Sequence, residues 1–105
     1  MRRPPPRREE GSPPEVIQRV VRASLPQFRQ RCYEPALRSN RSLQGRVSVR
    51  FVIDLGGVVT LNSDGGSDLP NGDVVRCYVR AFSALRFPRP EGGMVTVTYP
   101  VMLSP

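Results

Sequence analysis

The sequence predicts a small α+β domain whose elements follow the order α-β-β-α-β. Apolar residues recur at the spacing of a helix face in two stretches of the chain. In three other stretches they recur at or near every second position, which is the spacing of a strand face. A chain of 105 residues has room for one hydrophobic core. Because three strands are too few to bury both faces of a sheet, we expect both helices to pack on one side of it.

The first segment, residues 1–14, is predicted to be a disordered linker ahead of a domain at 15–105. It holds five Pro and four Arg and almost no apolar side chain, which is typical of an extended, solvated chain. The alternative is a Pro-rich ligand for an aromatic groove. No apolar stretch follows the basic start, so we expect no export signal in this chain. If the domain works outside the cytoplasm, its membrane anchor should lie upstream in a longer protein.

The first helix is expected to begin near Ser12 and to bury an apolar stripe. Ser12, two prolines and then Glu15 form a helix-start signal. Pro35 removes a backbone donor and clashes with the preceding turn, so we expect a kink or an early end there, with the helix split in two. The stripe consists of Val16, Ile17, Val20, Val21, Phe28, Cys32, Tyr33 and Leu37.

Beyond residue 45 the period changes from 3.6 to 2, which predicts a β-hairpin. The alternating apolar positions of its first strand are Val47, Val49, Phe51 and Ile53. The Asp-Leu-Gly-Gly run at 54–57 supplies turn residues able to take positive φ, and 58–61 should form the second strand. The polar stretch 62–73 is expected to be a loop. The candidates to cap the next helix are Asp68, Asn71 and Asp73.

A second helix and a last strand complete the expected domain. The helix must stop before Pro88, and its apolar positions are Val74, Val75, Tyr78, Val79, Phe82 and Leu85. The last strand spans Met94 to Leu103. The positions on one of its faces are Val95, Val97, Tyr99, Val101 and Leu103. Pro100 has no N–H to donate to a ladder, so this strand should lie at an edge of the sheet.

The residue types exclude most catalytic and metal chemistry. The chain has no His, which removes the commonest acid–base group and a principal metal ligand. Nine carboxylates are scattered, and the two Cys have no metal-ligand spacing. We therefore expect a protein that is not an enzyme and that uses no metal, cofactor or small-molecule substrate.

The positive charge leaves more than one class of partner open. All sixteen cationic residues are Arg, and the formal net charge is +7. The absence of Lys fits a GC-rich coding sequence, and the alternative is recognition of phosphate or carboxylate by the planar guanidinium. The charges are spread along the chain, without a helix-turn-helix or RNP-like pattern. An Arg-rich cytosolic nucleic-acid-binding domain is the alternative function.

Two features of the expected fold are candidates for function. Cys32 and Cys77 lie on different helices, and their spacing leaves open a stabilising disulfide or two buried thiols of a cytosolic protein. The last strand offers edge backbone groups that an extended partner segment can pair with. Pro100 can equally serve to block such pairing.

Six short segments occur in an order that resembles the AgmX/PglI C-terminal domain family, a divergent relative of the TonB C-terminal domain. They are Arg31-Cys-Tyr-Glu34, the run Gly45–Ile53, Gly57-Val-Val59, Val75-Arg-Cys77, Phe87-Pro-Arg-Pro90, and Gly92-Gly93 with Val97-Thr-Tyr-Pro100. The resemblance covers about residues 15–104.

This resemblance implies a TonB C-terminal-like fold with a three-stranded antiparallel sheet and a disulfide between Cys32 and Cys77. It also implies a periplasmic domain of a membrane-anchored envelope protein, of the TonB-like or gliding-motility type. Such a domain would couple an inner-membrane protein to an envelope or outer-membrane partner. The partner segment would bind by strand addition at Met94, Val95, Thr96, Val97, Thr98 and Tyr99. A structural tail without a partner is an alternative that the residues do not separate from this one.

Overall fold

The computed structural model describes residues 14–105, so the linker expected at 1–14 and the helix start expected at Ser12 lie outside or at the border of the described residues. The elements in chain order are α1 (Pro14–Phe28), the π-helical segment η2 (Arg29–Tyr33), α2 (Glu34–Leu37), β1 (Gly45–Ile53), β2 (Val59–Asp64), α3 (Gly72–Phe82) and β3 (Val95–Leu103). The predicted α+β class and the order α-β-β-α-β are confirmed.

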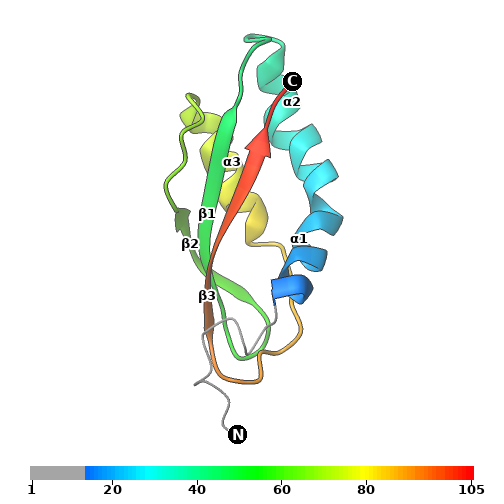
Figure 1. Ribbon diagram of the computed structural model, residues 1–105, viewed down its shortest axis with the longest axis vertical. Helices are drawn as coiled ribbons and strands as arrows, with labels where there is room; N and C mark the ends of the chain where they lie inside the picture. Colours follow the sequence, from blue (N-terminus) through cyan, green and yellow to red (C-terminus); the bar gives the residue numbers. More distant parts are fainter. Residues whose placement is uncertain (1–13) are drawn as a thin grey trace, which may run out of the picture.

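The sheet has the strand order β2-β1-β3, with β1 in the centre and both neighbours antiparallel to it (Figure 1). The ladder between β1 and β3 is continuous from Gly45 opposite Leu103 to Ile53 opposite Val95. β3 therefore occupies an edge of the sheet, where the proline within it predicts that it should lie.

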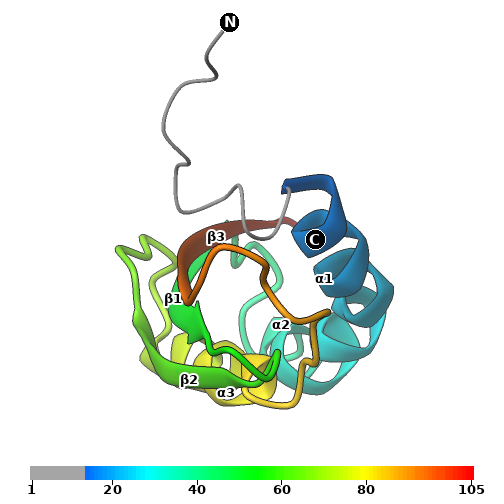
Figure 2. The same cartoon turned by 90° about the horizontal axis from the view of Figure 1, so that it is seen from below.

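Both long helices cover the same side of the sheet, which curves around them (Figure 2). The core fills the space between these layers, and its aromatic centre is Phe51, whose ring centroid lies 5.6 Å from that of Phe82 and 5.9 Å from that of Phe87. The inward positions of β1 are Val47, Val49, Phe51 and Ile53, all completely buried, as their alternation predicts. Three strands thus bury one face fully, and the residues of the other face are mostly exposed or half-buried, with Ser48 as a buried exception.

The first helix does not end at Pro35 but passes through a π-helical turn and continues to Leu37. The N–H of Glu34 donates to the carbonyl of Arg29, five residues earlier, instead of four. This wider turn stands directly before Pro35, which has no N–H and would clash in a regular helix. The expected break is therefore a local change of helix type, and the early end is not observed.

The hairpin strand β2 is longer than the expected segment 58–61 and contains a β-bulge. Its register against β1 shifts between Arg50 and Val52. At this point Leu61 has φ 54°, a left-handed conformation that costs an L-residue about 1–2 kcal/mol. The side-chain amide of Asn62 donates to the carbonyl of Val79 at 3.1 Å, so the bulge ties β2 to α3.

Helix α3 starts at Gly72 with a side-chain cap. Oδ1 of Asn71 accepts a hydrogen bond from the N–H of Val74 at 3.1 Å, which makes Asn71 the one that caps among the three candidates. The helix ends at Phe82, earlier than its apolar pattern suggested. Leu85 is buried in the turn that follows, where its N–H donates to the carbonyl of Phe82 at 3.1 Å.

Candidate functional site

The direction of the backbone groups on β3 follows from the pair Ser48 and Pro100, which lie opposite each other on β1 and β3. The carbonyl of Ser48 accepts from the N–H of Gly65 at 2.7 Å, and the N–H of Ser48 donates to Oγ of Ser67 at 2.9 Å. Both backbone groups of Ser48 therefore point away from β3. Ser48 and Pro100 are therefore a non-hydrogen-bonded pair of the antiparallel ladder. In such a pair the backbone N and O of both residues point away from each other, so those of Pro100 point to the outer edge of the sheet.

The same alternation assigns the other positions of β3. Residues 95, 97, 99, 101 and 103 direct their backbone groups to β1, and residues 96, 98, 100 and 102 direct theirs outward. Thr98 and Met102 each present an N–H at the outer edge, whereas Pro100 between them presents only a carbonyl. The edge is thus able to pair with another strand, but its row of donors is interrupted near the C-terminal end.

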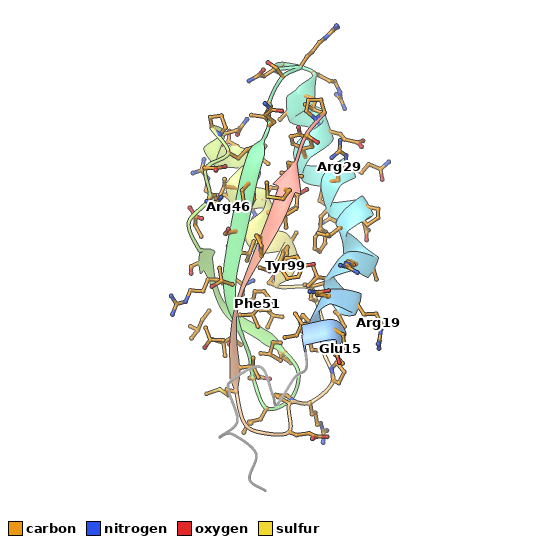
Figure 3. All side chains as sticks on the ribbon, in the orientation of Figure 1. Glu15, Arg19, Arg29, Arg46, Phe51 and Tyr99 are labelled. Atoms are coloured by element: carbon orange, nitrogen blue, oxygen red, sulfur yellow. A yellow bond between two sulfur atoms is a disulfide. The ribbon has the colours of Figure 1, made fainter. Side chains whose placement is uncertain are left out.

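The side chains of the predicted partner-binding residues divide between the two faces of the sheet. Val95 is buried in the core, and Val97 and Tyr99 are half-buried on the helix side, where Tyr99 packs 6.2 Å from Phe82 between ring centroids (Figure 3). Thr96 is half-buried and Thr98 exposed on the opposite face. The remaining member, Met94, precedes β3 and is 64 % exposed. What these residues share is therefore the backbone of one edge and not a single side-chain surface.

The structure places the sulfur atoms of Cys32 and Cys77 at bonding distance, 2.00 Å, with their Cα atoms 5.6 Å apart. Cys32 belongs to η2 and Cys77 to the middle of α3, so this pair joins the first helical segment to α3 within the layer that covers the sheet. Cys32 is buried within the core and Cys77 is half-buried beside it. No cysteine in residues 14–105 is left as a free thiol.

Arg29 links the π-helical segment η2 to the residue that follows β3. Its Nη2 donates to the carbonyl of Ser104 at 2.9 Å, just beyond the last residue of the strand. The guanidinium also lies 4.9 Å from the ring centroid of Tyr33, and its Nε is 3.5 Å from a carboxylate oxygen of Glu34. Arg29 is labelled in Figure 3, and Figure 1 shows the C-terminus beside this part of the helix. The C-terminal end of the edge is therefore held against the helical layer.

A second surface, which sequence reasoning missed, lies between α3 and the segment after β2. It is an open hollow of about 590 Å³. Its lining residues are Asp64, Ser67, Leu69, Gly72, Val75, Arg76, Val79 and Arg80. The signal present in the sequence was the pair of arginines four residues apart on one helix, which share a face. The opposite wall could not be found from the sequence, because the loop was predicted but neither the bulge before it nor its path beside α3 was.

Metal and membrane-spanning features are not found in the part of the chain that the structure describes. Residues 14–105 contain no group of three or more His, Cys, Asp or Glu side chains arranged to hold a metal ion. None of the helices within the same range has both the length and the apolar character that crossing a bilayer requires.

Comparison with known proteins shows the fold but not a family. No family model matches the chain, and no curated protein matches it. The NMR solution structure of the C-terminal domain of TonB from Helicobacter pylori is similar, with a TM-score of 0.64 and 22 % sequence identity. The match covers 87 % of this chain and 81 % of that domain. The fold is therefore that of a TonB C-terminal domain, and the resemblance to the AgmX/PglI family is not confirmed.

Proposed function

We propose that residues 15–105 form a TonB-like interaction domain that binds an extended segment of an envelope protein by strand addition at β3. The observation that carries this proposal is the edge itself: β3 belongs to a TonB C-terminal-like fold and directs alternate backbone groups away from β1. An extended segment bonding to these groups would become the fourth strand of the sheet. Residues 1–14 would serve as the linker to an upstream anchor.

The exposed parts of Val97 and Tyr99 support this mode of binding. Both side chains lie on the helix side of β3 and are only half-buried. A strand added beside β3 would place its own side chains next to them and remove apolar surface from water. Pro100 limits the pairing, because it offers no N–H at the edge. We therefore assign the contact to Met94 through Tyr99, ahead of this proline.

The proposed compartment is the periplasm. A disulfide between Cys32 and Cys77 would persist in an oxidising compartment and be reduced in most cytosols. A domain held there by an upstream inner-membrane anchor would couple that protein to an outer-membrane or other envelope partner. This role includes the gliding-motility type of envelope protein, to which the sequence resemblance points.

Backbone amide NMR tests the proposal with synthetic peptides that copy periplasm-facing segments of outer-membrane proteins. Peptide binding should shift amide signals of residues 94–103. The variant Thr98→Pro should abolish binding, since it removes an outward N–H without touching the ladder to β1. Thr98→Ala is the matched control, because it alters the same side chain and keeps the donor. Binding that survives in Thr98→Pro, or shifts confined to other elements, would exclude strand addition at β3.

A further inference from the structure

The hollow beside α3 lies near the edge of the sheet formed by β2, and the proposed strand-addition site is the other edge, formed by β3. Its outer wall begins at the end of β2, and β2 and β3 are the two edges of the sheet. Figure 2 shows α3 alongside β2, on the side of the sheet remote from β3. A ligand could therefore occupy the hollow while β3 is paired, and the two sites can be tested separately.

The hollow combines an apolar floor with a cationic rim. Leu69 and Val75 are buried and Val79 is half-buried, so the floor is built from core side chains. Arg76 and Arg80 stand over it from exposed positions one helical turn apart. This arrangement of apolar contact area with a few charged groups is what a binding site for a polar chain requires.

The two guanidinium groups are available to a ligand. Arg80 forms no ion pair within residues 14–105. Nη2 of Arg76 lies 2.5 Å from Oδ1 of Asp73, but the two side chains are 66 % and 91 % exposed. An exposed pair of this kind contributes little and is readily exchanged for another carboxylate. Gly72 leaves room for the Arg76 guanidinium, since a Cβ there would lie 3.2 Å from Nη1.

Asp64, which supplies the carboxylate among the lining residues, is already engaged by the loop. Its Oδ1 accepts from the N–H of Gly66 at 3.0 Å and from the N–H and Oγ of Ser67 at 2.9 and 2.7 Å. The hydrogen bonds from Ser67, followed by the one from Gly66, lower the pKa of Asp64. The carboxylate therefore stays ionised, and its Oδ1 is fully occupied by hydrogen bonds from the loop. The charged residues of the lining are two arginines and one aspartate, so the lining has a net charge of +1.

The spacing of the two arginines matches one chain conformation of an acidic ligand. Four residues of helix rise separate them by about 6 Å along α3. In an extended chain, side chains on the same face recur every second residue, about 6.6–6.8 Å apart. Carboxylates at alternate positions of an extended segment can thus meet both guanidinium groups, whereas consecutive acidic residues would point to opposite sides.

We propose that this hollow binds an extended acidic segment of a partner protein, with carboxylates at alternate positions paired to Arg76 and Arg80. The chain of the segment lies over Leu69, Val75 and Val79. A second copy of this chain is a poor occupant, because each copy carries a net charge of +7. The site is a second contact for the same partner or a contact for another one, independent of β3.

The test uses a labelled synthetic peptide of alternating Glu and Thr, and a second peptide of the same composition built from Glu-Glu-Thr-Thr repeats, in which no two Glu lie two residues apart. Fluorescence anisotropy at low salt should show tighter binding of the alternating peptide, and amide NMR should place its contacts on α3 and on residues 64–69. The double variant R76Q/R80Q should weaken binding by about tenfold or more.

The matched control is R19Q/R22Q, which removes the same charge from exposed positions of α1 (Arg19 is labelled in Figure 3). It should bind the alternating peptide within about twofold of the unaltered protein, and so should Thr98→Pro. Equal losses in the two double variants, or equal affinity for both peptides, would overturn the proposal in favour of unspecific charge attraction. A DNA oligonucleotide that displaces the peptide from α3 with a steep salt dependence would overturn it in favour of nucleic acid.

Discussion

Gly57 and Phe87 approach each other so closely that a Cβ on Gly57 would lie 2.0 Å from the carbonyl oxygen of Phe87. Gly57 has φ 83°, and the N–H of Phe87 donates to its carbonyl at 3.0 Å. The turn between β1 and β2 is thereby fastened to the segment after α3. Position 57 therefore requires glycine for two independent reasons: its φ is positive, and the carbonyl of Phe87 leaves no room for a Cβ.

The substitution Gly57→Ala should accordingly destabilise the domain by more than about 3 kcal/mol, because strain adds to a clash with backbone. Urea unfolding followed by circular dichroism measures the change. Gly66→Ala is the control, since Gly66 has φ 111° and a Cβ added to it would meet no atom within 4 Å. This control should lose only about 1–2 kcal/mol. Similar losses in both variants would show that the contact with Phe87 is looser than described.

Tyr33 and Tyr78 are both completely buried, but only one hydroxyl is satisfied. The Tyr33 hydroxyl donates to the carbonyl of Leu43, whereas the Tyr78 hydroxyl has no hydrogen-bond partner among the described residues. Tyr33→Phe should therefore cost about 1–3 kcal/mol by orphaning a buried carbonyl, and Tyr78→Phe should be neutral or stabilising. Urea midpoints of the two variants give the answer, and a loss in Tyr78→Phe as large as in Tyr33→Phe would point to a buried water on Tyr78.

Alkaline pH should weaken the fold through Tyr78. Burial raises the pKa of this phenol to about 12 from its ordinary value of 10.0. Between these values the unfolded chain releases the proton first, so the free energy of unfolding should fall by about 1.4 kcal/mol per pH unit above pH 10. Unfolding curves of the unaltered protein and of Tyr78→Phe across this window isolate the effect as their difference. Parallel pH profiles would contradict the assignment.

The bond between Cys32 and Cys77 should contribute about 2–4 kcal/mol, since it closes a loop with a sequence separation of 45. The melting temperature of the oxidised protein should drop on addition of dithiothreitol. The variant C32A/C77A should melt at a lower temperature than the oxidised protein, whether or not dithiothreitol is present. A thiol count before and after reduction verifies the starting state. If the melting temperature of the oxidised protein does not change on reduction, the bond contributes nothing, and the loop must be constrained by other contacts.

The conformation of Leu61 predicts a stabilising substitution. This residue combines φ 54° with a side chain that is 78 % exposed, so its burial offsets little of its strain. Leu61→Asn should raise stability by about 0.5–1 kcal/mol, because Asn tolerates the left-handed region. Leu55→Asn is the control at another exposed leucine, 62 % exposed and without positive φ, and it should change little. A destabilised Leu61→Asn would mean that Leu61 makes contacts within the domain that outweigh the strain.

The sequence was sufficient for those features that local pattern determines. The alternation around Phe51 located β1 and its buried face, and the missing N–H of Pro100 placed β3 at an edge. The π-helical turn at Pro35 was foreseen only as a kink. How the helix absorbs a proline depends on whether packing against the core favours its continuation, and periodicity does not contain that information.

The candidate sites show the same division. The edge position of β3 could be predicted because a proline inside the strand leaves one ladder donor missing. Which of its backbone groups point outward had to come from the pairing of Ser48 with Pro100. The hollow beside α3 could not, because its far wall depends on the bulge at Leu61 and on the bond from Asn62 to Val79. That bond joins residues 17 positions apart, on elements whose relative placement no short motif encodes.

The position of the bridge also decides how the domain would respond to tension. A pull between the start of α1 and the end of β3, which lie toward opposite ends of the long axis in Figure 1, runs through the Cys32–Cys77 bond. The intervening chain could extend to about 150 Å if released, but the bridge holds its ends 5.6 Å apart. β1 and β2 lie inside this closed loop and β3 outside it. An oxidised domain under load can therefore extend only through its two end segments, whereas a reduced one could extend about twice as far.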